Sequence, residues 1–300
     1  MSRKRKKGKR PRKPRQQAGR VRQDTMLDVV IPVYGRPDML GQCLAALAAT
    51  AGDLSYSLFV VDDKGPDQEA LQKIYAALPP DAWLLRNAQN MGFPYTANRG
   101  AEQGRSEFIV FLSTDIVLQE GCLQAMIGEM LENPKTGVVG AKLLFPEESD
   151  DPARPVGKIQ HAGLCVNIQG NLAHANIGWS PDHLKVNQRR VLQAVTGGLL
   201  MTRRETWQRV AKYYRQIDGD PTRGGFNLVY GKGTYEDVEY CIAARGNGYD
   251  VVYVPQAVAT HHVGASVKGS ETGGFALNRN ATIFAARCGH MLHWDMWRFC

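Results

Sequence analysis

The sequence predicts an α/β protein with a doubly wound, mostly parallel sheet, and three observations support this. The short runs at 27–33, 58–61 and 108–112 are almost continuously apolar, as in strands buried on both faces of a parallel sheet. Segments with helical spacing of apolar residues separate them, which indicates strand-helix-strand crossovers. A chain of 300 residues with 43% hydrophobic residues can also bury a full core without disulfides or a structural metal.

Strands and helices alternate regularly through the first half of the chain. We expect strands at 27–33, 58–61, 83–85, 108–112 and 138–139, and helices at 39–52, 66–78, 94–104 and 119–131. In open sheets of this kind, ligands bind beyond the carboxyl ends of the strands. The residues that follow each strand are therefore the first candidates for a functional site.

The regular alternation stops near residue 145. An acidic, proline-rich loop is expected at 146–155, strand-like segments at 158–202 around an irregular middle at 176–188, helices at 203–214, 235–245 and 275–287, and a strand at 251–254. Gly197 and Gly198 interrupt the run 191–201. Paired glycines inside a strand indicate close approach by a backbone or a ligand.

Basic residues are concentrated at the amino terminus. Residues 1–22 contain 12 of the 37 Lys and Arg residues and no acid, which leaves 25 basic and 29 acidic residues in the remainder. Too few hydrophobic groups accompany these charges to offset the entropy of ordering, so residues 1–24 are expected to be a disordered basic tail. Such a tail either contacts a polyanion such as DNA, RNA or an acidic membrane, or is a solvated extension that aids solubility.

Composition also argues against several classes of protein. No apolar run approaches the roughly 18 residues that a membrane-spanning helix needs, so no transmembrane segment is expected. The six cysteines include no C-x-x-C pair, which argues against a zinc module. Without an export signal, reduced thiols and a cytoplasmic location are the simplest interpretation. The glycosylation sequon at Asn280 is a short pattern that arises often by chance.

Acidic residues follow two of the expected strands. Asp62 and Asp63 come directly after 58–61, and Asp115 follows 108–112. Carboxylates at one sheet edge repel one another unless a cation or hydrogen-bond donors lie between them, and a divalent metal with a phosphate group would satisfy them. The structural alternative for each acid is a turn residue or a helix cap, because Asp favours both.

A second candidate site lies at the start of the helix expected at 235–245. Glu236 and Asp237 are adjacent there, and a carboxylate held rigidly at the mouth of a cleft could act as a general base. The structural alternative is that Thr234 is the N-cap and Asp237 either completes a capping box or complements the helix dipole. Two adjacent acids do not decide between these interpretations.

A third candidate site is the histidine pair beyond the strand at 251–254. His261 or His262 could ligate a metal as a neutral imidazole. Together with Asp115 it would form a mixed nitrogen and oxygen site suited to Mn²⁺. The alternative is a hydrogen-bonded surface histidine.

Seven short segments, each weak alone, occur in one order between residues 27 and 266. They are VVIPVY at 29–34, VVDD at 60–63, NMGF at 90–93 with ANRG at 97–100, FLSTD at 111–115, TGG at 196–198 with MTRR at 201–204, EDVEYC at 236–241 with GY at 248–249, and Pro255 before His261 and His262. In this order the set resembles the family 2 glycosyltransferases of the GT-A fold. The resemblance implies a GT-A type α/β fold with a smaller, mixed β region on the acceptor side.

The resemblance also implies a nucleotide-sugar donor, commonly a UDP-sugar, bound over the first half of the sheet. The donor-binding residues within 32–34 and 62–63, at the ends of the first two strands, would contact the base and ribose. Asn90, Gly92 and Asn98 would lie under the diphosphate. The donor-binding set that the resemblance implies is Pro32, Tyr34, Asp62, Asp63, Asn90, Gly92, Asn98, Ser113, Gly197 and Gly198.

Metal and catalytic roles follow from the same resemblance. Asp115 matches the last acid of the family's D-x-D motif, and His261, or else His262, matches its later ligand for Mn²⁺ or Mg²⁺. Asp237, next to Glu236, falls on the catalytic base, which would remove the acceptor's hydroxyl proton in a single inverting displacement.

The chain also departs from the family pattern. Ser113 replaces the first acid of D-x-D, which leaves the metal with fewer protein ligands. The Q-x-x-R-W element and the transmembrane helices of processive synthases are absent, which favours transfer of a single sugar. The interpretation divides the chain into a basic tail (1–24), a nucleotide-sugar-binding half (25–140), an acceptor-binding and catalytic half (141–270) and a helical end (271–300).

Three functions remain open from the sequence. The leading one is an inverting glycosyltransferase whose acceptor is a surface glycan or, given the basic tail, a nucleic acid such as a hydroxylated base in viral DNA. The second is a non-catalytic adaptor that binds a nucleotide or a polyanion. The third, nucleotidyl transfer, lacks the glycine- and arginine-rich amino-terminal loop expected of sugar-phosphate nucleotidylyltransferases.

Overall fold

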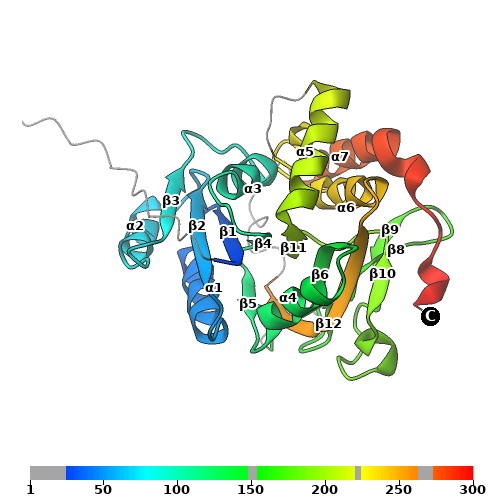
Figure 1. Ribbon diagram of the computed structural model, residues 1–300, viewed down its shortest axis with the longest axis horizontal. Coiled ribbons are helices and arrows are strands. Elements are labelled where there is room, and N and C mark those ends of the chain that lie inside the picture. Colours follow the sequence, from blue (N-terminus) through cyan, green and yellow to red (C-terminus); the bar gives the residue numbers. More distant parts are fainter. Residues whose placement is uncertain (1–24, 148–153, 220–223, 263–272, 300) are drawn as a thin grey trace, which may run out of the picture.

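A ten-stranded sheet forms the centre of the protein (Figure 1). The computed structural model describes residues 25–147, 154–219, 224–262 and 273–299. Along the sheet the strand order is β10-β12-β6-β11-β4-β1-β2-β3, with β5 paired to β12 and β7 to β6. A separate two-stranded antiparallel sheet joins β8 to β9. The predicted α/β class, with a largely parallel central sheet and a smaller β region, is confirmed.

Four parallel strands form the first half of the sheet. They are β1 (Leu27–Val33), β2 (Tyr56–Asp62), β3 (Trp83–Arg86) and β4 (Phe108–Leu112). They are connected through α1 (Pro37–Thr50), α2 (Gln68–Ala76) and α3 (Phe93–Ala101). Because β1 lies between β2 and β4 and runs parallel to both, the loops that follow these three strands share one edge of the sheet.

Strand directions are mixed in the second half. The strands β6 (Thr136–Leu144) and β12 (Asp250–His261) are parallel, β11 (Leu199–Arg203) lies antiparallel between β6 and β4, and β10 (Arg190–Leu192) pairs antiparallel with β12. Leu199 pairs with Leu112 at the end of β4. The antiparallel direction of β11 therefore places Gly197 and Gly198 at the same sheet edge as the residues that follow β4.

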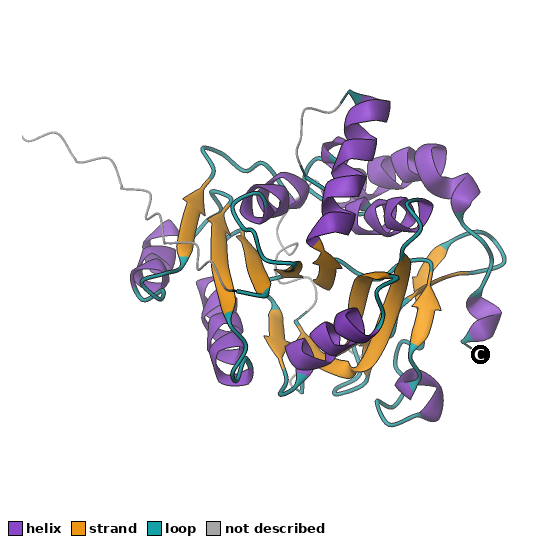
Figure 2. Ribbon diagram, in the orientation of Figure 1, coloured by secondary structure: helices purple, strands orange, loops and turns teal. Residues whose placement is uncertain are grey.

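Helices cover both faces of the sheet (Figure 2). Residues of α1, α2 and α4 (Cys122–Glu132) pack into one hydrophobic cluster, and residues of α3, α5 (Arg204–Asp218), α6 (Glu236–Gly246) and α7 (Gly273–Cys288) pack into the other. Strand β1 contributes Val29 and Ile31 to the first cluster and Val30 to the second, as the alternation of strand side chains requires. The continuous apolar run of β1 therefore serves two cores.

Short elements complete the described fold. They are the strands β5 (Ile116–Leu118), β7 (Ile159–His161), β8 (Leu164–Val166) and β9 (Leu172–His174), and the 3-10 helices η1 (Leu184–Asn187), η2 (Leu228–Tyr230), η3 (Gly289–Met291) and η4 (Met296–Arg298).

Two expected strands are longer than their apolar runs. The strand expected at 251–254 was too short, because β12 continues to His261 beyond an irregularity that contains Pro255. A proline cannot donate to the ladder and is tolerated at such irregularities. The strand expected at 138–139 is the centre of β6, which crosses the partition drawn at residue 140. Pairing with neighbouring strands, which local sequence does not show, extends both.

Several expectations concern regions at or beyond the limits of the described residues. Residues 1–24 lie outside the described residues, and so does the polyanion contact expected of 1–22. The same holds for Cys300 and for residues 263–266 at the end of the last motif. Among the described helices, none combines the length and the apolar character that a bilayer crossing requires. The five described cysteines, Cys43, Cys122, Cys165, Cys241 and Cys288, are buried and form no disulfide.

Candidate active site

The turns after β1 and β2 are packed directly against each other. Gly35, Arg36, Lys64 and Asp67 all have φ angles between 54° and 69°. A Cβ on Gly65 would lie 2.3 Å from the backbone nitrogen of Gly35, so the two turns touch through their backbones. Non-glycine residues in this left-handed region are held there by surrounding structure, and they cluster at functional sites.

The residues expected to contact the base and ribose lie at these turns. Asp62 is buried, and its Oδ1 accepts hydrogen bonds from the backbone nitrogen of Lys64 (3.0 Å) and from Gln68 Nε2 (3.3 Å). Pro32 is partly buried at the end of β1, and Tyr34 just beyond it is 42% exposed. Tyr34 follows Val33, which pairs with Asp62 in the sheet, so an exposed aromatic residue and a held carboxylate lie at neighbouring strand ends, as a nucleoside site would require.

Asp63 has a different environment from that of its neighbour. Its carboxylate accepts hydrogen bonds from Asn87 Nδ2 (2.7 Å) and from the backbone nitrogens of Met91 (2.7 Å) and Gly92 (2.8 Å). These three donors shape the loop that joins β3 to α3. Asp63 therefore holds the loop between β3 and α3 in place. The Asp62 carboxylate, by contrast, accepts hydrogen bonds from residues close to it in sequence, Lys64 and Gln68.

The loop after β3 joins the two halves of the chain. Asn90 Oδ1 accepts from the backbone nitrogen of Gly92 (3.1 Å), and a Cβ on Gly92 would lie 2.2 Å from the carbonyl oxygen of Gly231. With a φ of 89°, this position requires glycine for both reasons. Asn98 is buried, and both ends of its amide bind the backbone of Phe226, at 2.7 Å and 3.0 Å. Asn98 thus fastens α3 to the second half.

Asp115 and His261 meet at the end of β4. Asp115 Oδ1 lies 3.5 Å from His261 Nε2 and accepts a hydrogen bond from Ser113 Oγ (2.5 Å). Burial alone would raise the pKa of Asp115, but His261 and the Ser113 hydroxyl outweigh it and lower the pKa below its usual value. The backbone nitrogen of His262 donates to the backbone carbonyl oxygen of Asp115 (2.9 Å) and not to its carboxylate. The ring that faces Asp115 is therefore that of His261.

Gln160 determines which His261 nitrogen faces Asp115. Gln160 Oε1 lies 3.1 Å from His261 Nδ1, and a carbonyl oxygen can only accept, so Nδ1 carries the hydrogen. In the neutral imidazole, Nε2 then presents its lone pair toward the Asp115 carboxylate. Two lone pairs that face each other require a proton or a cation between them. With a proton on Nε2, His261 donates to Asp115 and lowers its pKa, and a cation would take the place of that proton. Metal-ligating histidines are held in this way by a partner on the other nitrogen.

These side chains fit a divalent cation that is shared with a ligand. Within the described ranges, no group of three or more His, Cys, Asp or Glu side chains converges on one point. Asp115 and His261 would thus supply two of the ligands, and the remaining positions would be filled by phosphate oxygens and water. Ser113, which replaces the first acid of D-x-D, orients Asp115.

Replacing Gln160 by Leu tests this orientation. The variant should bind Mn²⁺ about 10- to 100-fold more weakly, because His261 loses the partner that holds its ring and tautomer. Titration of the full-length protein with Mn²⁺, followed by calorimetry in the presence of UDP, measures the change. Gln193→Leu is the matched control, since Gln193 is equally buried but bonds the backbone of His293. Equal Mn²⁺ affinity in the two variants would contradict the role of Gln160.

The paired glycines connect this candidate cation site to the two acids of α6. The backbone nitrogen of Gly197 donates to Asp237 Oδ2 (2.7 Å), and a Cβ on Gly197 would lie 3.0 Å from Asp237 Cβ. On the next residue, a Cβ on Gly198 would lie 3.6 Å from His261 Cε1, and the Gly198 carbonyl accepts from the backbone nitrogen of Ser113 (2.9 Å). The pair was expected inside a strand that a backbone or a ligand approaches, whereas both glycines precede β11 and the groups near them are side chains. This segment brings Asp237 and His261 to neighbouring residues.

The start of α6 differs from a capped helix. Thr234 and Tyr235 have φ angles of 79° and 72°, and the N-cap residue Tyr235 makes no capping hydrogen bond through its side chain. The capping box considered for Thr234 and Asp237 is therefore wrong. The left-handed turn instead directs Asp237 to Gly197. Local sequence could not show this, because Gly197 is 40 residues away along the chain.

The two acids of α6 lie in environments that raise their pKa values to different extents. Burial and the charge of Asp237 raise the pKa of Glu236 well above its usual value, and Glu236 Oε2 is buried without a hydrogen-bond partner. Burial also raises the pKa of Asp237, but the backbone nitrogens of Gly197 (2.7 Å) and Val238 (2.9 Å) donate to its carboxylate. Asp237 is therefore the acid of the pair that ionises at the lower pH.

Sequence reasoning missed a set of polar residues behind the site. His161 is fully buried on β7, and its Nδ1 lies 2.8 Å from His174 Nδ1. Burial lowers the pKa of His161 well below its usual value and that of His174 to about 4, so both rings are neutral. Gln160 is next to His161 on the same strand. Polar residues in a strand of three, Ile159–His161, were the available signal.

Comparison with known proteins identifies the family to which this chain is similar. Residues 28–194 match the family described as "Glycosyl transferase family 2". The chain is 24% identical over 248 residues to the uncharacterized protein y4gI of Sinorhizobium fredii (strain NBRC 101917 / NGR234), covering 80% of this chain and 25% of that protein. It is 24% identical over 254 residues to the O-antigen biosynthesis protein RfbC of Myxococcus xanthus, covering 82% of this chain and 18% of that protein. The chain thus spans a quarter or less of the length of these relatives.

Solved structures with the same fold carry nucleotides or nucleotide-sugars. GalNAc-T7 with UDP, GalNAc and Mn²⁺ aligns with a TM-score of 0.59 at 11% identity, covering 79% of this chain and 43% of that one. S. aureus TarS 1-349 in complex with UDP-GlcNAc aligns with a TM-score of 0.55 at 15% identity, covering 87% and 66%. At these identities the likeness establishes the fold. Since the family match covers more than half of the chain, the protein belongs to glycosyl transferase family 2.

Proposed function

We propose that this protein transfers a sugar from a nucleotide-sugar donor, a UDP-sugar, to an acceptor hydroxyl with inversion at the anomeric carbon. The observation that supports this most directly is the segment Gly197–Gly198, with Asp237 against its first residue and His261 near its second. A general base and a candidate cation site therefore lie side by side at the sheet edge where the donor is expected. This is the arrangement that a displacement at a sugar phosphate needs.

Asp237 is the residue that would move the proton. As the ionised member of the acidic pair, it takes the proton of the acceptor hydroxyl while the acceptor oxygen bonds to the anomeric carbon. The bond from that carbon to the phosphate oxygen breaks, and its electrons leave with UDP. One displacement from the face opposite the leaving group inverts the configuration. The backbone nitrogens of Gly197 and Val238 hold the carboxylate in place throughout.

Asp115 and His261 would hold Mn²⁺ or Mg²⁺. When bound, the cation neutralises charge on the departing diphosphate. Gln160 keeps His261 Nε2 directed at Asp115, and Ser113 fixes the carboxylate. The presence of Mn²⁺ with GalNAc-T7 supports the choice of a divalent cation, and the nucleotide-sugar bound to TarS supports a UDP-sugar donor. Both supports come from proteins that share the fold.

A saccharide hydroxyl on a surface glycan is the acceptor we favour. The similarity to a protein of O-antigen biosynthesis supports a glycan acceptor over a nucleic acid. The nucleic-acid acceptor suggested by the basic tail rests on residues 1–22, which lie outside the described residues.

A donor screen tests the proposal. Full-length protein is incubated with Mn²⁺, a panel of nucleotide-sugars and oligosaccharide acceptors, and UDP release is recorded together with the anomeric configuration of the product. The expected result is release of UDP from one donor with an inverted linkage. Donor binding without any release would favour the adaptor, release of pyrophosphate would favour nucleotidyl transfer, and labelling of hydroxylated DNA instead of saccharide would overturn the glycan acceptor.

A further inference from the structure

The turn that leads into Asp237 is held in an unfavourable backbone conformation. Gly233, Thr234 and Tyr235 have consecutive φ angles of 128°, 79° and 72°. For Thr and Tyr such values persist only where neighbouring groups impose them. The side chain of the N-cap residue Tyr235 makes no capping hydrogen bond, and Glu236 bonds the backbone of Thr234 from within α6. A further set of groups that hold this turn comes from another helix, α7.

Asn280 of α7 is the first of these groups. Its side chain is 1% exposed, and its Nδ2 donates to the carbonyl oxygens of Tyr230 (2.9 Å) and Gly233 (2.6 Å). The same nitrogen lies 3.2 Å from Thr234 Oγ1 and 3.4 Å from the Thr234 carbonyl. Asn280 Oδ1 accepts from Arg279. One buried amide thus binds both sides of the turn, and it is too enclosed to serve as a glycosylation acceptor.

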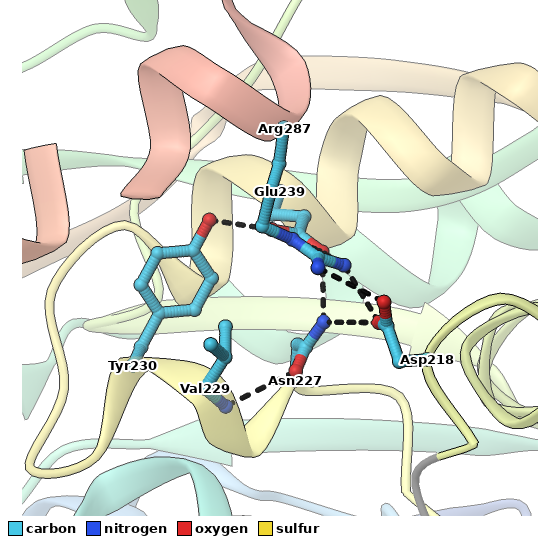
Figure 3. A network of polar contacts seen from close by, with 6 residues as sticks. All are labelled: Asp218, Asn227, Val229, Tyr230, Glu239 and Arg287. Atoms are coloured by element: carbon cyan, nitrogen blue, oxygen red, sulfur yellow. Dashed lines mark hydrogen bonds and ion pairs between the residues drawn. The ribbon is translucent and has the colours of Figure 1, made fainter. Parts of the chain in front are cut away.

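Two further residues of α7 contact the same region. Phe284 stacks on the ring of Tyr235, with centroids 5.2 Å apart and planes inclined by 27°. Arg287 binds Glu239 of α6 at 3.0 Å and Asp218 at 2.7 Å (Figure 3).

The network around Glu239 ties α6 to two other segments. Asn227 donates to both Glu239 Oε1 and Asp218 Oδ2 at 3.0 Å, and Tyr230 donates its hydroxyl to Glu239 (Figure 3). Asn280, Phe284 and Arg287 are spaced by four and three residues, so they lie on one face of α7. Along that face, Asn280 contacts the turn, Phe284 contacts Tyr235 just before α6, and Arg287 contacts Glu239 in the first turn of α6.

We propose that α7 is a positioning element for the catalytic base, with Asn280 as its principal residue. This inference rests on the proposed function, because it takes Asp237 as the base. By holding the turn at 233–235, Asn280 sets the direction in which α6 begins and therefore the distance of Asp237 from Gly197 and from the acceptor. Asn280 itself touches no reacting atom in this scheme. Its effect falls on turnover and not on donor binding.

Full-length Asn280→Asp and Asn280→Ala test the proposal. Asp has the same shape but lacks the donor nitrogen, so both variants should lower kcat by about 10- to 100-fold, as expected when a reacting group is misplaced by about 1 Å. The KM for the donor should change less than threefold. Hydrogen exchange at the backbone of 233–239 should become faster. Asn176→Ala is the control, because the Asn176 side chain, like that of Asn280, donates to a backbone carbonyl, in this case that of Phe299. It should keep kcat.

Three outcomes would overturn the proposal. One is a kcat within threefold of the unmodified protein in both Asn280 variants. Another is an equal loss of kcat in Asn176→Ala, which would mark the effect as general destabilisation. If both Asn280 variants fail to fold, Phe284→Leu replaces them, with the same expected fall in kcat at a nearly constant KM. An unchanged kcat in Phe284→Leu is the third outcome. Asp237→Asn is measured in parallel: if it keeps full turnover, the base assignment and this inference both fail, whereas its inactivity beside active Asn280 variants removes only the role of α7.

Discussion

Replacing Asp237 by Asn should lower kcat by about 10² to 10⁴-fold and leave donor affinity nearly unchanged, because a positioned base supplies about that factor. The amide has the same shape and its oxygen can still accept from the backbone nitrogen of Gly197, which is 2.7 Å from Asp237 Oδ2. What is lost is the ability to take a proton. UDP release under saturating donor gives kcat, and a titration with donor in the absence of acceptor gives the affinity.

Glu236→Gln is the comparison that separates the two adjacent acids. Burial and the Asp237 charge raise the pKa of Glu236 well above its usual value, so of the two acids Glu236 is the less suited to accept a proton as a carboxylate. An amide at this position should therefore retain far more turnover than an amide at Asp237. If Glu236→Gln proves the more damaging of the two, the roles of the acids must be exchanged.

The pH profile of kcat/KM should show the same base. Burial raises the pKa of Asp237 above its usual value of 3.8, and only the deprotonated carboxylate accepts a proton. Activity should therefore fall as the pH drops through this raised pKa, with the acid limb above pH 3.8 and a slope of one. Because Glu236 titrates beside it, the limb reports the pair. In Asp237→Asn the limb should vanish from the residual activity, and an unaltered limb would contradict the assignment.

Replacing Asp115 by Asn should abolish Mn²⁺-dependent activity, with a loss of at least about 10²-fold, more than expected for a residue that only supports a ligand. The pKa of Asp115 lies below its usual value, so at neutral pH the substitution removes a full negative charge from beside His261. Initial rates measured over a range of Mn²⁺ concentrations, with Mg²⁺ as a second series, determine both maximal activity and apparent metal affinity.

The two histidines provide the control for this result. His261→Ala should weaken Mn²⁺ binding as strongly as Asp115→Asn, since the ring nitrogen of His261 lies 3.5 Å from Asp115 Oδ1. His262→Ala should have little effect on metal affinity, because the contact of His262 with Asp115 is a backbone hydrogen bond to the Asp115 carbonyl, which alanine can also make. Equal losses in the two alanine variants would contradict the placement of the cation between Asp115 and His261.

Much of the fold could be predicted from the sequence because the information is local. The apolar run of β1 and the helical periodicities in the first half are properties of neighbouring residues, and each predicted a strand or helix near its observed limits. The second half was predicted less completely. Strand β5 has three residues, and β12 reaches His261 only because β5 and β6 pair with it there. Short strands of this kind derive their stability from partners that are distant in the chain.

The candidate site divides in the same way. The sequence by itself determined which chemical groups follow the strands: the acids after β2 and β4, the glycine pair before β11, the acidic pair at α6 and the two histidines. Only the tertiary structure decided that Asp63 builds a loop, that His261 and not His262 faces Asp115, and that Gln160 and Asn280 support the site. The physical reason is that each position carries its own side-chain chemistry, whereas packing between distant segments selects the hydrogen-bond partners, such as Gly197 and Asp237, 40 residues apart, and Gln160 and His261, 101 residues apart.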